Sequence, residues 1–175
     1  MNILITGGAG SGKSTYALQC LRGLPGPRYY AACMKPADAA EWAAVARNRR
    51  ERQGMGITTI ETYHCAGLLA IEPGASLVLE CLCNLLANEM FGGRNADVQA
   101  ADRIEESLLR LAATCGDLLV VTNEIGGDGV AYDEDTMAYI QALTRLNRRL
   151  AQAFDQVWEL VCGIPCLRKG NEVKA

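Results

Sequence analysis

The chain has 175 residues, of which 50% are hydrophobic and 21% charged, so it has the make-up of a globular protein rather than of a disordered or fibrous one. This length suits one compact domain, and we expect residues 1–175 to form a single nucleotide-binding domain. The net charge of -3, from 17 basic and 20 acidic residues, gives no electrostatic reason to expect nucleic acid or an anionic membrane as partner.

Strand and helix patterns alternate along the chain. Apolar runs predict strands at residues 2–6, 28–33, 57–61, 75–81, 117–122 and 156–162, the last of which we take as the final strand. Helical patterns fill residues 13–21, 38–52, 82–90, 101–115 and 133–153. A nearly continuous apolar run such as 117–122 is typical of a strand in a parallel sheet that is buried on both faces. The order therefore predicts an α/β fold with a mostly parallel central sheet and helices on both faces.

A glycine-rich segment joins the first predicted strand to the first predicted helix. It matches the P-loop pattern G-x-x-x-x-G-K-S, and we expect each of its residues to bind nucleotide: Gly7, Gly8, Ala9, Gly10, Ser11, Gly12, Lys13 and Ser14. Lys13 is the predicted catalytic cation on the β and γ phosphates, and the Ser14 hydroxyl is a predicted Mg²⁺ ligand. An ordinary glycine turn is the alternative, which the flanking strand and helix disfavour.

Two acidic residues follow predicted strands. Glu80 ends the apolar run 76–80, and we expect it to assist Mg²⁺ or a substrate hydroxyl, as a catalytic, metal-binding and substrate-binding residue. Glu124 follows the strand 117–122, at the sheet edge where open α/β proteins bind ligands, and is a predicted acceptor-binding residue. The alternatives are a solvent-facing acid for Glu80 and a turn role for the adjacent Asn123.

The predicted helix 38–52 ends in the basic run Arg47–Arg52. Arg49 and Arg52 could bind nucleotide or substrate phosphate, although a solvated helix face fits the composition as well. His64 is the sole histidine, and its type alone assigns it no chemistry. The eight cysteines show no C-x-x-C pair, so we expect buried free thiols. No basic leader or membrane span is visible, and we expect a cytoplasmic protein.

Taken together, these segments resemble the bifunctional adenosylcobinamide kinase/adenosylcobinamide-phosphate guanylyltransferase family of cobalamin biosynthesis. The matching blocks are Ile5–Ser14, Arg47–Arg52, Leu79–Leu82 with Leu85–Asn88, Val121–Gly126 and the tail from Leu146 to Pro165. The resemblance implies a RecA-like P-loop NTPase fold, often assembled as a homotrimer. It also implies phosphorylation of the aminopropanol hydroxyl of the corrinoid adenosylcobinamide with ATP or GTP, and then GMP transfer from GTP through a histidine in a block reading R-H-R-x-E-R.

The sequence departs from that family pattern at three places. Asn48 stands where the guanylylated histidine is expected, Gly10 where arginine is common, and Glu80 where aspartate is usual. An amide cannot form the phosphoramidate that a histidine nitrogen forms. The chain could therefore be a kinase only, could use His64 as another nucleophile, or could be a diverged paralogue that binds nucleotide without catalysis.

Overall fold

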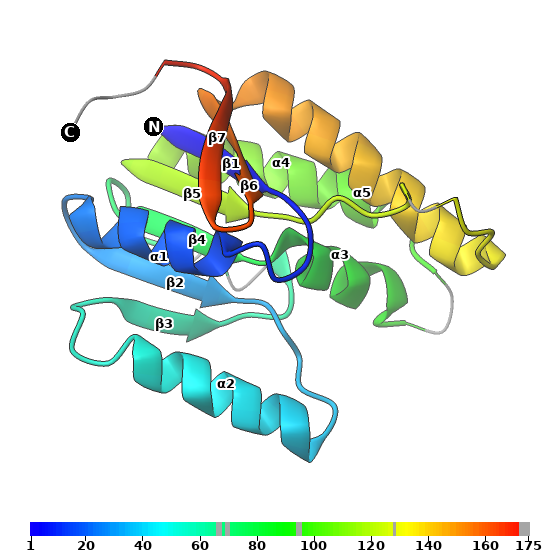
Figure 1. Cartoon of the computed structure of the whole chain (residues 1–175), viewed down its shortest axis with the longest axis horizontal. Coiled ribbons are helices and arrows are strands. Elements are labelled where there is room, and N and C mark those ends of the chain that lie inside the picture. Colours follow the sequence, from blue (N-terminus) through cyan, green and yellow to red (C-terminus); the bar gives the residue numbers. More distant parts are fainter. Residues whose placement is uncertain (66–67, 69–70, 94–95, 128, 172–175) are drawn as a thin grey trace.

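The computed structural model describes residues 1–65, 68, 71–93, 96–127 and 129–171. Within these residues the chain alternates strands and helices along most of its length (Figure 1). The strands are β1 (Asn2–Thr6), β2 (Arg28–Ala32), β3 (Thr58–Glu61), β4 (Ser76–Glu80), β5 (Asp117–Val121), β6 (Gln156–Val161) and β7 (Ile164–Lys169). The helices are α1 (Lys13–Gly23), α2 (Ala39–Glu51), α3 (Leu82–Phe91), α4 (Ala100–Thr114) and α5 (Glu134–Ala153).

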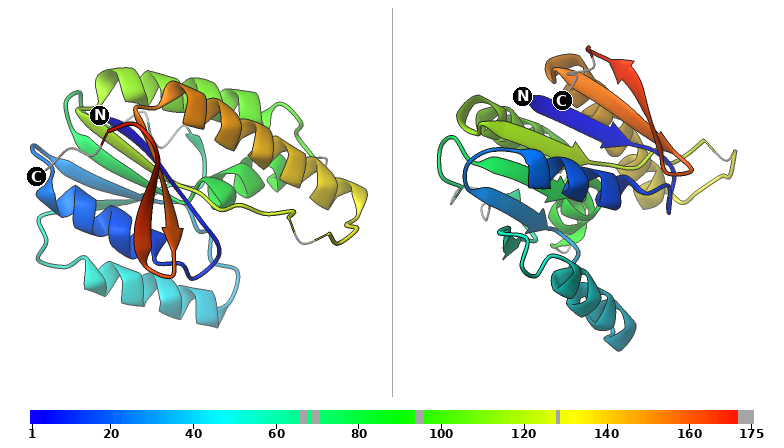
Figure 2. Two further views of the ribbon diagram at one scale, coloured as in Figure 1. Left: turned by 45° about the horizontal axis from the view of Figure 1, so that its top comes forward. Right: turned by 60° about the vertical axis from the view of Figure 1, so that its left-hand side comes forward.

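The strands form one seven-stranded sheet in the order β3-β2-β4-β5-β1-β6-β7, parallel except for β7. Helix α1 lies on one face of this sheet, and α3, α4 and α5 lie on the other (Figures 1 and 2). The predicted α/β class, with a mostly parallel sheet between helices, is confirmed. The carboxyl ends of the parallel strands meet at one edge, where ligands bind in open α/β sheets.

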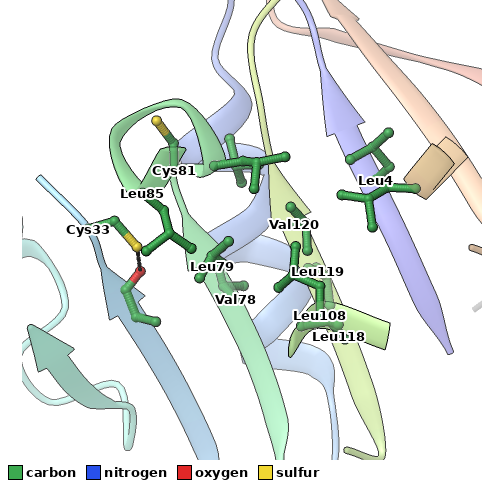
Figure 3. Packing of buried hydrophobic residues seen from close by; sticks show 14 of the residues in the cluster. Leu4, Cys33, Val78, Leu79, Cys81, Leu85, Leu108, Leu118, Leu119 and Val120 are labelled. Carbon is green, nitrogen blue, oxygen red and sulfur yellow. Dashed lines mark hydrogen bonds between the residues drawn. The ribbon is translucent and has the colours of Figure 1, made fainter. Parts of the chain in front are cut away.

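The core lies on the inner strands. Leu77, Val78 and Leu79 of β4 are fully buried, as are Leu118 and Leu119 of β5. Figure 3 shows side chains of both strands, with Leu85 and Leu108 from the helices packed beside them. A parallel sheet covered on both faces buries successive residues of a strand, which explains why these segments read as unbroken apolar runs.

Helix α2 stands apart from this core. It lies beside the edge strand β3 and extends away from the other helices (Figure 2), and none of its residues is buried. Its start is fixed by Asp38, whose side chain accepts a 2.8 Å hydrogen bond from the Glu41 amide. Of the helices in the described residues, none is long and apolar enough to cross a membrane.

The sequence interpretation missed one strand. We took residues 156–162 as the last strand, but β6 ends at Val161 and the chain turns back into the antiparallel β7. Cys162 and Gly163, with φ of 51° and 83°, make the two-residue turn that such tight hairpins require. Pro165 has no amide hydrogen to donate to a neighbouring strand, and it is tolerated here because β7 is at the sheet edge. The exposed position of Cys162 in this turn also corrects our expectation that every cysteine is buried.

Candidate active site

The P-loop connects the carboxyl end of β1 to α1, as predicted. Gly7, Gly10 and Gly12 have φ of 139°, 70° and 94°, which allows the loop to curl above the amino end of the helix. Gly7 also has no room for a side chain, because a Cβ atom there would lie 2.5 Å from the Leu160 carbonyl oxygen of β6. The loop thus has the strand, turn and helix context that a phosphate-binding loop needs.

Lys13 is the first residue of α1, and its ammonium group folds back over the loop. Its Nζ donates hydrogen bonds to the carbonyl oxygens of Gly7 at 3.0 Å and Gly8 at 2.6 Å. Burial lowers the pKa of Lys13, and the Glu80 carboxylate opposes this shift. A largely desolvated cation held by backbone carbonyls is well placed to exchange them for phosphate oxygens.

The next residue, Ser14, joins α1 to β4. Its Oγ donates a 2.7 Å hydrogen bond to Oε1 of Glu80, and the other carboxylate oxygen, Oε2, is buried and has no hydrogen-bond partner among the described residues. Burial raises the pKa of Glu80, while the Ser14 hydrogen bond and the Lys13 charge act against that shift. One hydroxyl and one carboxylate side by side fit Mg²⁺, which binds a few protein oxygens together with phosphates.

Two residues of the basic block, Asn48 and Arg52, line the same cavity as Glu80. A cavity of about 100 Å³ lies among the carboxyl ends of β2, β3 and β4 and the last turns of α2. It is lined by Tyr30, Ala32, Met34, Val45, Asn48, Arg52, Glu61, Glu80 and Asn84. The position where the family resemblance expects a histidine therefore opens into the same cavity as the candidate metal-binding acid.

The two arginines proposed for nucleotide binding differ in their surroundings. Arg52 is only 7% exposed; its guanidinium stacks 4.1 Å above the Tyr30 ring and its Nε donates to Thr59 Oγ1 at 3.1 Å. Arg49 is exposed and pairs with Glu61 at 3.0 Å. Arg52 thus ties α2 to the sheet, whereas Arg49 can leave its surface partner for a phosphate at little cost.

Glu124 follows β5, the strand between β4 and β1, and lies toward α5. It lines a groove of about 640 Å³ together with Thr6 and Gly8, and it accepts a 3.4 Å hydrogen bond from Thr6 Oγ1. Of the two acids, Glu124 thus faces this groove, whereas Glu80 faces the cavity beneath α2.

Asn147 of α5 was not singled out as a site residue in the sequence. Its side chain accepts from Thr122 Oγ1 at 2.8 Å and donates to the Asn123 carbonyl at 3.0 Å, which fixes the chain between β5 and Glu124. The signal for it was the Leu146–Leu150 stretch within the family-like tail.

His64 lies beside α3. It follows β3, and its Nδ1 lies 3.7 Å from Oε1 of Glu89 on α3. The described lining of the cavity around Asn48 does not include His64.

The chain is similar to known proteins along nearly its whole length. Residues 3–167 match the family described as cobinamide kinase / cobinamide phosphate guanyltransferase. The bifunctional adenosylcobalamin biosynthesis protein CobU of Salmonella typhimurium is 32% identical, with 94% of this chain and 97% of the relative covered. CobP of Pseudomonas aeruginosa, another bifunctional adenosylcobalamin biosynthesis protein, is 30% identical over 98% of this chain and 99% of the relative.

Solved structures show the same fold at low sequence identity. The flagellar accessory protein FlaH of Methanocaldococcus jannaschii superposes with a TM-score of 0.54 at 12% identity, over 97% of this chain and 78% of that one. An ATPase of a bacterial type III secretion system gives a TM-score of 0.56 at 11% identity, over 95% and 56%. These neighbours support the P-loop NTPase fold. At such low identity they do not indicate which substrate this chain binds.

Proposed function

The chain belongs to the cobinamide kinase / cobinamide phosphate guanyltransferase family of enzymes, and we propose that it uses ATP or GTP to phosphorylate the aminopropanol hydroxyl of adenosylcobinamide. The observation that supports this most is the hydrogen bond of 2.7 Å between Ser14 and Glu80. Together with the hydrogen bonds of Lys13 to the Gly7 and Gly8 carbonyls, it supports the proposal because a hydroxyl, a carboxylate and an ammonium group beside one glycine-rich loop are the groups that phosphoryl transfer needs.

The phosphate end of the nucleotide would lie in the P-loop, from Gly7 to Ser14. Backbone amides of the loop and the positive end of α1 would bind the phosphate oxygens. Lys13 would leave the carbonyls of Gly7 and Gly8 and stabilise charge that develops on the transferred group. Ser14 and Glu80 would hold Mg²⁺, which neutralises phosphate charge when it is bound.

The acceptor hydroxyl would attack the γ-phosphorus as the bond to the leaving nucleoside diphosphate breaks, and it would lose its proton to a carboxylate. Glu80 is our candidate for this role, because its Oε1 faces Ser14 while its Oε2 has no hydrogen-bond partner among the described residues. Glu124, in the groove beside Gly8, would bind the acceptor. Catalysis would depend mainly on positioning and charge stabilisation.

For the second reaction of the family, we propose that this chain does not form a guanylylated intermediate at residue 48. Asn48 lacks a nucleophilic ring nitrogen, and His64, which lies 3.7 Å from Glu89, is not among the described residues that line the cavity around Asn48. A separate protein would then carry out GMP transfer. Following the family resemblance, we also propose a homotrimer in the cytoplasm, which sedimentation of the purified chain and cell fractionation can test.

A transfer assay tests the kinase proposal. Purified chain with Mg²⁺, adenosylcobinamide and γ-labelled ATP or GTP should give labelled adenosylcobinamide phosphate, and Lys13→Ala should reduce the rate by about 100-fold or more. Nucleotide binding without labelled product from either nucleotide would contradict the proposal. That result would support instead a non-catalytic nucleotide-binding paralogue.

A further inference from the structure

The cavity beneath α2 contains polar groups that make no contact with other side chains. Asn48 of α2 and Asn84 of α3 both line it, and neither side chain hydrogen-bonds to another of the described residues. Oε2 of Glu80 is the third such group, and it is buried. Because buried polar atoms of a folded protein are nearly always paired, this oxygen indicates that a ligand supplies its partner.

The charges around the cavity limit the kind of ligand. Arg52 stacks on Tyr30, and Glu61 pairs with Arg49, so these charged side chains already have partners. The Arg52 guanidinium in the wall disfavours a cation, and the Glu80 carboxylate disfavours an anion. The groups that are left are two amides and one carboxylate oxygen. They match a neutral ligand with a hydroxyl group, which can both donate and accept.

The apolar wall and the size of the cavity limit the ligand further. Ala32, Met34 and Val45 lie in the wall beside the amides. The cavity measures about 100 Å³. Since a cavity of about 150 Å³ holds benzene, this one has room for a few non-hydrogen atoms and not for a purine base. A short aliphatic alcohol fits, with its hydroxyl on the polar side and a methyl group on the apolar side.

The cavity adjoins the proposed phosphate site. Glu80 lines it and also accepts the hydrogen bond of Ser14, the last residue of the P-loop. A hydroxyl that bonds to Glu80 from within the cavity would therefore lie beside the proposed metal and the phosphate to be transferred. The acceptor proposed above carries such a group, because its aminopropanol arm ends in a carbon that bears one hydroxyl and one methyl group.

We propose that the cavity beneath α2 binds the alcohol end of the aminopropanol arm, with Asn48 and Asn84 as acceptor-binding residues. The two amides hydrogen-bond to the hydroxyl, and Met34 and Val45 contact the methyl group. The rest of the large corrinoid lies outside the cavity, toward Glu124 after the neighbouring strand β5. Asn48 then takes part in the kinase reaction, at the position where the family resemblance expects a histidine. The inference rests on the proposed kinase function.

Leucine substitutions remove each amide with little change in size. Asn48→Leu and Asn84→Leu should each raise the KM for adenosylcobinamide about five- to tenfold, the effect of one lost hydrogen bond, and leave the KM for nucleotide within about twofold. Gln152→Leu is the control, because this exposed amide of α5 is not among the described residues that line the cavity. An unchanged acceptor KM in both asparagine variants would overturn the inference and leave the kinase function standing.

Equilibrium binding tests the inference without turnover. Calorimetry compares adenosylcobinamide with an analogue that carries propylamine in place of aminopropanol and so lacks the hydroxyl. The wild type should bind adenosylcobinamide about tenfold more tightly than the analogue, and Asn48→Leu should reduce this preference to about twofold. Equal wild-type affinity for both corrinoids, or binding of neither, would overturn the inference. A hydroxyl preference that Asn48→Leu removes, in a chain that forms no labelled product, would keep this inference and contradict the kinase function.

Discussion

Ser14 Oγ lies 2.7 Å from Glu80 Oε1, which connects the first turn of α1 to the carboxyl end of β4 across 66 residues of sequence. The contact joins the P-loop to the strand that supplies an acid, so the two halves of the proposed metal site are adjacent. The first two predictions address the two ends of this hydrogen bond.

Ser14→Ala should weaken the binding of the proposed catalytic metal. We expect kcat to fall by about tenfold to 100-fold, with a higher Mg²⁺ concentration needed for half-maximal rate, because one oxygen ligand is lost. Magnesium titrations of the kinase rate measure both effects. Ser107→Ala on α4, whose hydroxyl bonds to the Arg103 carbonyl, is the matched control. An unchanged magnesium dependence would remove Ser14 from the metal site.

Glu80→Gln should abolish activity and stabilise the fold at neutral pH. The pKa of Glu80 is raised by burial, so as pH rises the unfolded chain loses this proton before the folded chain does. The carboxylate therefore destabilises the fold above the ordinary carboxyl pKa of about 4.3, up to a full effect above its folded pKa. At pH 7 we expect the variant to melt about 2–4 °C higher than the wild type, an effect on the order of 1 kcal/mol.

The pH dependence distinguishes this cause from a general change in packing. The melting-temperature difference between Glu80→Gln and the wild type should shrink as the pH falls toward about 4, where the unfolded carboxyl is also protonated. Glu106→Gln is a control on the exposed surface of α4, where an ion pair contributes little. A difference that is constant with pH would contradict the burial of a charged Glu80.

The sequence predicted the parts of the site that depend on local patterns. Gly7–Ser14 was recognisable because its glycines, its lysine and its flanking strand and helix are contiguous. Glu80 was found because an apolar strand ends in an acid. Neither pattern contains the pairing of Ser14 with Glu80, since that contact depends on where the sheet places β4 relative to β1.

The features that the sequence did not predict are all long-range. The stacking of Arg52 on Tyr30 requires α2 to return to the edge of the sheet, and a basic run alone fits a solvated face equally well. Strand β7 was hidden because Pro165 normally argues against a strand, and its edge position was unknown. The contact of Gly163 with Ser11 follows from that missed strand.

The different surroundings of two neighbouring arginines lead to a stability prediction. Arg52→Ala should lower the free energy of unfolding by about 2–3 kcal/mol, because the buried stack on Tyr30 and the bond to Thr59 are lost together. Arg49→Ala should change it by less than about 1 kcal/mol, since its partner Glu61 is a surface contact. Urea unfolding measures both values. Equal effects would show that Arg52 does not anchor α2.

The amide side chain of Asn48 leads to a prediction about labelling of the chain by GTP. Wild-type chain incubated with α-labelled GTP should carry no acid-labile label, because an amide cannot form a phosphoramidate, and His64→Ala should behave in the same way. Asn48→His supplies the missing nitrogen, and we expect it to become labelled. Acid-labile label on the wild type that disappears in His64→Ala would contradict the kinase-only proposal and restore the second activity.

A substitution at Glu124 distinguishes binding of the acceptor from binding of the nucleotide. It lines the groove of about 640 Å³ beside Gly8, whereas Ser14 and Glu80 form the proposed metal site, so its removal should affect acceptor binding alone. Glu124→Gln should raise the KM for adenosylcobinamide by about tenfold, the effect of one lost charged hydrogen bond, and leave the KM for nucleotide within about twofold. Steady-state kinetics with each substrate varied in turn measure this, with Glu134→Gln in the first turn of α5 as control. A rise in the nucleotide KM instead would move Glu124 to the donor side of the site, because a group that binds only the acceptor cannot change donor affinity.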